Sequence, residues 1–172
     1  MPDVSSQVAV IERLEREEIP LLGVSFGSIK VTPGEKVDRK DTIPTPSLTV
    51  PAQLSKGLYT AICLDLDAPF RSFNLASPIA HWVQTDLSAS SPESLELKSA
   101  QAPVAPWIAA GPPPGAAPHR YLVLLYEQLP SLSDAPNLEP FSTFQRVRID
   151  VDALTKKLHL GEMVAVNYFV SN

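Results

Sequence analysis

The feature that most constrains this chain is a set of apolar segments separated by proline-rich stretches. LYTAICLDLD (58–67), IAHWVQTDL (79–87) and HRYLVLLYEQL (119–129) have the length and the β-branched and aromatic content of core strands, and MVAVNYFVSN (163–172) predicts a final strand. Proline makes up 18 of the 172 residues, about twice its average use, and it disfavours helix interiors and central strands alike. We therefore expect one mostly β domain over residues 1–172, largely antiparallel, with short helices at its periphery.

The remaining segments carry weaker signals. A helix is expected at 5–18, where apolar residues recur every third position, and another at 150–160, which begins with aspartates and is followed by a glycine. The other expected segments are a strand at 24–31, a proline-punctuated loop with one edge strand at 38–57, a polar loop at 88–103 and an edge strand at 144–150.

Charge and cysteine content exclude several classes of protein. The net charge is −5, and the basic residues form no stripe interleaved with aromatics, so nucleic-acid binding is not expected. The one cysteine, Cys63, lies in an apolar run and is expected to be a buried small hydrophobe. No stretch approaches the ~20 apolar residues of a membrane span, and the N-terminal residues lack a signal-peptide pattern. We expect a cytoplasmic protein with no membrane span.

Two motifs with catalytic or metal-binding associations have ordinary explanations here. GVSFG (23–27) matches G-x-S-x-G, but the residues after it predict a strand and a turn where a nucleophile elbow needs a helix. Ser25 is therefore expected on a strand or hairpin. The histidines at 81, 119 and 159 lack the spacing of a helical metal face, and no metal or cofactor is expected. His159 ends the expected helix 150–160, where a cation suits the helix dipole.

The other two histidines form a possible constellation with an acidic residue. His81 and His119 lie within or at the edge of apolar strands, and Asp65 lies near the end of a third. Because side chains alternate along a strand, His119 and Tyr121 are expected on one face and Arg120 on the other. We expect Arg120 to make a structural ion pair.

LDLDAPFRSF…SPIAHW (64–82) followed by GPPPGAAPHRYLVLLYEQ (111–128) resembles the phosphatidylethanolamine-binding protein family, also called the Raf kinase inhibitor protein family. The resemblance rests on three features in order: the D-x-D-A-P stretch, a histidine in the next core strand, and the G-P-P stretch leading to H-R-Y. It implies an antiparallel β-sandwich with short peripheral helices and an N-terminal helix. That helix, and the end of the sequence shortly after the last expected strand, resemble the fungal carboxypeptidase Y inhibitor-like branch.

The resemblance also implies a small anion pocket for phosphate-bearing groups. Its ligand-binding residues would be Asp65, Ala68, Pro69, His81, Gly111, Pro112, Pro113, His119 and Tyr121. The imidazoles and the tyrosine hydroxyl can donate hydrogen bonds to phosphate, and an aspartate can hold a histidine in its protonated form. Glycine at 111 would let a backbone N–H approach the ligand closely. The prolines restrict φ before binding, so little entropy is lost when the ligand arrives.

Three functions stay open at this stage. The favoured one is a binding or regulatory protein for a phosphate-bearing small molecule or phospholipid head group, acting as a protease inhibitor or signalling modulator with a protease or kinase as partner. The second is a small-molecule enzyme (an isomerase, cyclase or hydratase) that uses Asp65, His81, His119 and Tyr121 for general acid–base chemistry. The third is a mononuclear metal site of two histidines and one aspartate, which has no sequence support.

Overall fold

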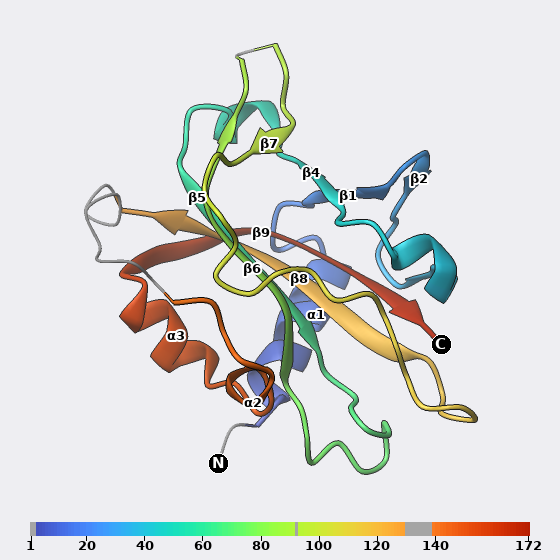
Figure 1. The fold of residues 1–172 in the computed structure, drawn as a ribbon. Coiled ribbons are helices and arrows are strands. Elements are labelled where there is room, and N and C mark those ends of the chain that lie inside the picture. Colours follow the sequence, from blue (N-terminus) through green and yellow to red (C-terminus); the bar gives the residue numbers. More distant parts are fainter. Residues whose placement is uncertain (1–2, 92, 130–138) are drawn as a thin grey trace.

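Strands dominate the computed structural model, which describes residues 3–91, 93–129 and 139–172 (Figure 1). The strands are β1 (Gly23–Phe26), β2 (Ile29–Lys30), β3 (Glu35–Lys36), β4 (Ser47–Thr49), β5 (Tyr59–Asp65), β6 (Ile79–Ala89), β7 (Leu97–Lys98), β8 (His119–Gln128) and β9 (Leu160–Ser171). Among the described residues they form a six-stranded sheet of order β3-β9-β8-β5-β6-β7 and a three-stranded sheet of order β2-β1-β4. All pairs of neighbouring strands are antiparallel except β3 with β9, which is parallel.

The helices are short and lie outside the sheets. The α-helices are α1 (Ser5–Glu15), α2 (Thr143–Arg146) and α3 (Val151–Lys157), and the 3-10 turns are η1 (Arg39–Thr42) and η2 (Ala52–Leu54). Within the described part of the chain, no helix combines the length and the apolar character needed to cross a membrane.

The central strand β5 is buried at every position, because both faces of the large sheet are covered. Ile62 and Leu64 belong to one apolar cluster together with buried residues of α1 and α3. Ala61 and Cys63 point to the other face and belong to a second cluster with residues of β1 and β4. A strand covered on both faces carries a near-continuous apolar run, which is the pattern at 58–67. The expected mostly β sandwich and the buried Cys63 are confirmed.

Asn167 of β9 ties the small sheet to the large one. Its side chain is fully buried, and its amide donates to the carbonyls of Leu22 at 2.9 Å and Val31 at 3.1 Å. The side-chain oxygen Oδ1 of Asn167 accepts from the Tyr168 backbone N–H at 2.8 Å. These bonds satisfy backbone groups that the large sheet cannot reach with its own ladder.

The prediction of an edge strand at 144–150 is wrong. Thr143–Arg146 forms a helical turn instead, and Ser142 and Gln145 form a capping box at its start. The alternating apolar and charged residues of this segment imitate a strand, but the reciprocal side-chain to backbone bonds of a capping box stabilise the first turn of a helix.

The other expected elements occur with shifted bounds. The N-terminal helix ends at Glu15 rather than at 18, and α3 begins after Asp150, whose side chain accepts from the Ala153 backbone N–H at 2.9 Å. The loop expected at 88–103 contains the end of β6 and the short strand β7, and its residue 92 lies outside the described residues.

The strand expected at 24–31 is two strands joined by a tight turn. Phe26 pairs with Ile29 across the turn, and Gly27 has φ of 57°, a left-handed conformation that favours glycine. Ser25 therefore lies on a hairpin strand, as expected, and the GVSFG motif has no helix after it.

We predict that Asn167→Ala lowers the free energy of unfolding by about 2–4 kcal/mol, because it leaves two buried carbonyls without donors and opens a small cavity. Urea unfolding followed by circular dichroism measures the change. The matched control is Asn172→Ala at an exposed position, which should stay within about 0.5 kcal/mol of the parent protein. Equal effects of the two substitutions would contradict the role given to Asn167.

Candidate functional site

Asp65 ends the central strand and lies between the two strands that carry the core histidines. It is paired with Ile79 of β6 on one side and with Tyr121 of β8 on the other. Its carboxylate is almost fully buried, and both oxygens are engaged: Oδ1 accepts from the Asp67 backbone N–H at 2.8 Å, and Oδ2 accepts from Nδ1 of His119 at 2.9 Å. The carboxylate is therefore fixed at the centre of the site.

A β-bulge directs His81 toward Asp65. Cys63 is paired with Trp82 and Leu64 with Ala80, so His81 is the extra residue on β6. In a bulge of this kind the regular alternation of side chains is broken. Trp82 packs in the cluster that contains Cys63, and His81 also faces this side of the sheet, with its ring edge-on to Tyr121 at 5.1 Å between centroids.

His81 is held as a neutral imidazole with a free lone pair. Its Nδ1 lies 2.8 Å from the carbonyl oxygen of Ile108, and because a carbonyl can only accept, the proton is on Nδ1. Burial lowers the pKa of His81 below its usual 6.5, although the Ile108 bond and the charge of Asp65 oppose the shift. The unprotonated Nε2 lies 3.9 Å from Oδ2 of Asp65.

His119 has the opposite protonation state. Nδ1 faces the Asp65 carboxylate and Nε2 faces the carbonyl oxygen of Pro69 at 3.2 Å, so both ring nitrogens need a proton. Burial alone would lower the pKa of His119, but the hydrogen bond to Asp65 and the charges of Asp65 and Asp67 outweigh it and raise the pKa above 6.5. The site thus contains a buried imidazolium–carboxylate pair next to a neutral imidazole.

Tyr121 forms the floor of the cluster. It is fully buried and stacks on Phe169 with 5.1 Å between ring centroids. Its hydroxyl oxygen accepts from the Gly111 backbone N–H at a long 3.3 Å. Burial, followed by the charge of Asp65, raises the pKa of Tyr121 far above its usual range, so the phenol keeps its proton.

Asp65, His81, His119 and Tyr121 are thus brought together, and they are almost completely covered. The exposed fractions are 4% for Asp65, 7% for His81, 1% for His119 and 0% for Tyr121. Among the described residues, no group of three histidine, cysteine or acidic side chains is arranged to hold a metal ion.

The other expected ligand-binding residues, at positions 68, 69 and 111–113, differ in how they contact this cluster. Pro69 contacts His119 through its carbonyl, and the Ala68 backbone N–H is held by Ser77 Oγ at 2.7 Å. The Gly111 N–H lies at Tyr121, but a Cβ at this position would meet its nearest atom only at 3.7 Å, so the space there does not require glycine. Pro112 is buried and Pro113 is half-buried.

Arg120 lies on the face of β8 opposite His119 and makes the expected ion pair. Its Nε and Nη2 donate to the two oxygens of Asp67 at 2.9 and 2.7 Å, and its backbone N–H donates to Asp67 as well, at 2.8 Å. Burial alone would raise the pKa of Asp67, but the bonds from Arg120 lower it below its usual value. The pair fixes the start of β8, and with it the position of His119.

Two residues near His81 gave no signal in the sequence. Ile108 supplies the carbonyl that sets the histidine tautomer. Arg146 of α2 is buried and donates to the carbonyls of Pro106 at 2.8 Å and Ala80 at 3.2 Å, so it ties the loop of Ile108 to β6. Backbone acceptors leave no pattern in a sequence, and a buried arginine in a four-residue helix looks like a surface residue.

A family model for phosphatidylethanolamine-binding proteins matches residues 27–169, and the chain belongs to this family. A curated relative, the putative odorant-binding protein A5 of Drosophila melanogaster, is 27% identical over 117 residues, which is 67% of this chain and 53% of that protein. The chain thus spans about half the length of this relative.

Solved structures show the same fold. A carboxypeptidase Y inhibitor, crystallised with its cognate proteinase, has a TM-score of 0.73 at 23% identity, over 95% of each chain. A phosphatidylethanolamine-binding protein from Plasmodium vivax has a TM-score of 0.67 at 17% identity, over 94% of this chain and 96% of that one. The assignment to a fungal branch stays a prediction.

We predict that Asp65→Asn lowers the pKa of His119 below 6.5, because the amide removes the negative charge and leaves burial as the main influence. The pKa of His81 should fall further, since Asp65 raises it in the parent protein. NMR titration of the imidazole protons measures both values. Asp38→Asn, at an exposed position, is the control and should shift neither histidine.

The same substitution should change how stability depends on pH. A histidine whose pKa is raised by folding stabilises the protein below pH ~6.5, and this stabilisation is lost as the pH rises through the folded value. The contribution of His119 should therefore decline as the pH rises above ~6.5 in the parent protein, and its sign should be reversed in Asp65→Asn, where a lowered pKa makes protonation unfavourable to folding. An unchanged pH profile in the variant would contradict the ion pair.

Proposed function

We propose that this protein is a binding protein for phosphate-bearing ligands and that the cluster of Asp65, His81, His119 and Tyr121 holds the phosphate group. Membership of the phosphatidylethanolamine-binding protein family supports the class of ligand. The free phosphate compound and the phospholipid head group share the chemistry that the cluster would recognise.

The observation that carries this proposal is that two hydrogen-bond donors at the cluster, one from His119 and one from the neighbouring Gly111 backbone, are only weakly engaged. The Nε2–H of His119 reaches the Pro69 carbonyl at 3.2 Å, and the Gly111 N–H reaches the Tyr121 hydroxyl at 3.3 Å, at or beyond the long end of N–H···O bonds. A phosphate oxygen is a stronger acceptor than a carbonyl or hydroxyl, because charge-assisted bonds are roughly twice as strong. An arriving phosphate can therefore take over both donors.

His81 would complete the site by taking up a proton. In neutral His81 the Nε2 atom carries a lone pair, which repels an anion. In protonated His81 the Nε2–H donates a hydrogen bond to the phosphate, in addition to those from His119 and Gly111. The buried pair of Asp65 and His119 has no net charge, so a protonated His81 is what would make the cluster cationic. Anion binding and protonation of His81 are then thermodynamically linked.

This linkage predicts that the affinity for phosphoethanolamine is highest at mildly acidic pH. Affinity should increase as the pH falls toward the lowered pKa of His81, and it should decrease at high pH as His119 loses its proton. The second ionisation of the phosphate, near pH ~6, opposes the increase at low pH because the ligand loses charge. Calorimetric titration at several pH values measures the profile.

His81→Asn tests the role of Nε2 in this binding. The asparagine amide can still donate to the Ile108 carbonyl, while the Nε2 atom is removed. We expect affinity for phosphoethanolamine to fall about tenfold or more and its increase at acidic pH to disappear, since a charge-assisted bond contributes about 1.5–3 kcal/mol. His159→Asn, outside the cluster, is the matched control and should bind like the parent protein. Absence of binding at any pH would overturn the proposal.

A second candidate function is acid–base catalysis by the same cluster. The observation that favours it is the different hydrogen bonding of the two histidines: His81 donates only to the Ile108 carbonyl, while His119 faces acceptors with both nitrogens. Their pKa values shift in opposite directions accordingly, which leaves a neutral base at His81 close to a protonated acid at His119. Incubation with small carbonyl metabolites, followed by NMR in deuterated water, would reveal proton exchange or isomerisation. Turnover that is lost in His81→Asn would favour this function over simple binding.

A protein partner is the third proposal for this chain. It is supported by the fold shared with a carboxypeptidase Y inhibitor that was crystallised with its cognate proteinase. Measuring the residual activity of carboxypeptidase Y with increasing amounts of this protein tests it directly. Unchanged proteinase activity at micromolar concentrations of the protein would argue against inhibition of this enzyme.

A further inference from the structure

We infer that Arg39 extends the phosphate cluster outward, so that the protein prefers phosphate esters that carry a second anionic group, such as a carboxylate. This inference rests on the proposed function, because it concerns the same site. Arg39 is the first residue of η1, and its side chain is exposed. It lies in the proline-punctuated segment 38–57, which contributes none of the residues expected to bind the ligand.

The guanidinium of Arg39 lies against Gly111. A Cβ atom at position 111 would be 3.7 Å from Nη2 of Arg39 and 4.0 Å from its Cζ. Since a Cβ is two bonds from the nitrogen of its own residue, Nη2 lies within about 6 Å of the Gly111 nitrogen. The N–H on that nitrogen is one of the two weakly engaged donors of the site, at 3.3 Å from the Tyr121 hydroxyl. An anion that takes over this donor therefore arrives beside Arg39.

Buried hydrogen bonds hold η1 next to the residues that precede Gly111. Thr42, the last residue of η1, is fully buried. Its hydroxyl accepts from the Ala110 backbone N–H at 3.0 Å and donates to the carbonyl of Arg39 at 2.8 Å. Its own carbonyl accepts from Nε1 of Trp107 at 2.8 Å. These bonds use only the backbone of Arg39, so its guanidinium is left available.

Arg39 makes no ion pair with a carboxylate of the described residues. Its neighbour Lys40 does, with Nζ at 3.8 Å from Oδ2 of Asp38. Asp41 follows in the same turn, and it too is unpaired with Arg39. A guanidinium carries five N–H donors in one plane and binds a carboxylate or a phosphate through two of them at once. The donors of Arg39 are thus open to a ligand.

The acidic residues at the cluster are already neutralised, so an ammonium group of a ligand would find no free carboxylate among them. Asp65 uses one oxygen for the Asp67 backbone N–H and the other for His119. Asp67 accepts from Arg120 with both of its oxygens. The unpaired charge beside the cluster is therefore positive.

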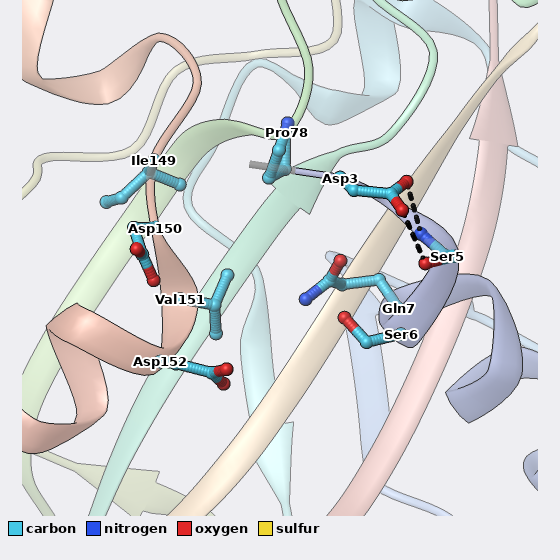
Figure 2. A pocket seen from close by; sticks show the side chains of 9 residues that line it. All are labelled: Asp3, Ser5, Ser6, Gln7, Pro78, Ile149, Asp150, Val151 and Asp152. Atoms are coloured by element: carbon cyan, nitrogen blue, oxygen red, sulfur yellow. Dashed lines mark hydrogen bonds between the residues drawn. The ribbon is translucent and has the colours of Figure 1, made fainter. Parts of the chain in front are cut away.

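Other carboxylates of this acidic chain gather away from Arg39. Figure 2 shows three of them around a cavity between the starts of α1 and α3, namely Asp3, Asp150 and Asp152. The turn η1 follows β3, which pairs with the C-terminal end of β9, and Figure 1 shows that end on a different side of the molecule from the start of α1. Because salt screens exposed charges beyond about 10 Å, a net charge of −5 is compatible with an anion site at Arg39.

These positions determine which part of a ligand would reach Arg39. The phosphate would take the Nε2–H of His119 and the Gly111 N–H. The next group of the ligand would then lie outside the cluster, whose four members are at most 7% exposed. A carboxylate in that place gains a charge-assisted, two-bonded contact with Arg39, while an ammonium is repelled. The site therefore favours a second negative charge.

The test compares 2-phosphoglycolate with phosphoethanolamine, two phosphate esters of similar size that carry a carboxylate and an ammonium group, respectively. Calorimetric titration at one pH and ionic strength should show phosphoglycolate binding at least about tenfold more tightly. The difference should decrease as salt is added, because Arg39 is exposed. Equal affinities, or tighter binding of phosphoethanolamine, would overturn the inference.

Substitution of Arg39 tests whether this residue causes the preference. Arg39→Gln should weaken phosphoglycolate binding about tenfold and reduce phosphoethanolamine binding much less. Arg39→Lys keeps the charge without the planar fork and should retain part of the preference. The matched control is Lys40→Gln, which removes the same charge from the same turn and should bind both compounds like the parent protein. Thermal unfolding shows whether each variant is folded. Equal losses in Arg39→Gln and Lys40→Gln would count against a specific contact.

The results also separate this inference from the proposed function. Absence of binding of either ester by the parent protein would overturn both, while binding that does not change in Arg39→Gln would overturn only the role of Arg39. O-phospho-L-serine and dihexanoyl phosphatidylserine, used below its critical micelle concentration, distinguish the two sources of the ligand. Tighter binding of the first would indicate a free phosphate ester, and tighter binding of the second would indicate a lipid head group.

Discussion

The structure depends on how two buried carboxylates are neutralised at the end of its central strand. Asp65 and Asp67 are 4% and 0% exposed, and each is engaged by a cationic group at the start of β8. A carboxylate buried without such a partner would be strongly unfavourable. His119 pairs with Asp65 on one face of β8, and Arg120 pairs with Asp67 on the other face of β8. Two neighbouring residues of β8 thus fix the bend at the end of β5.

The same requirement prepares the candidate site for its chemistry. Because Asp65 uses one oxygen for the bend and the other for His119, it keeps that imidazole protonated and oriented. The bulge in β6 then brings His81 to the same carboxylate without taking Trp82 out of the core. His81 and His119 lie on the two strands next to Asp65, yet they have opposite protonation states. His119 faces an acceptor with each ring nitrogen, whereas His81 has a hydrogen-bond acceptor only at Nδ1.

The sequence by itself determined the four long core strands, the burial of Cys63 and the faces of His119 and Arg120, because these follow from periodicities that act over a few residues. It also indicated the family, through the D-x-D-A-P stretch and the residues around His119. It predicted a strand at 144–150 where a capping box forms a helix, because alternation alone does not show which side-chain bonds form. The bulge at His81 and the acceptor from Ile108 were decided only by the tertiary structure. Each depends on groups that are distant in the chain, and a sequence pattern does not encode which of them meet.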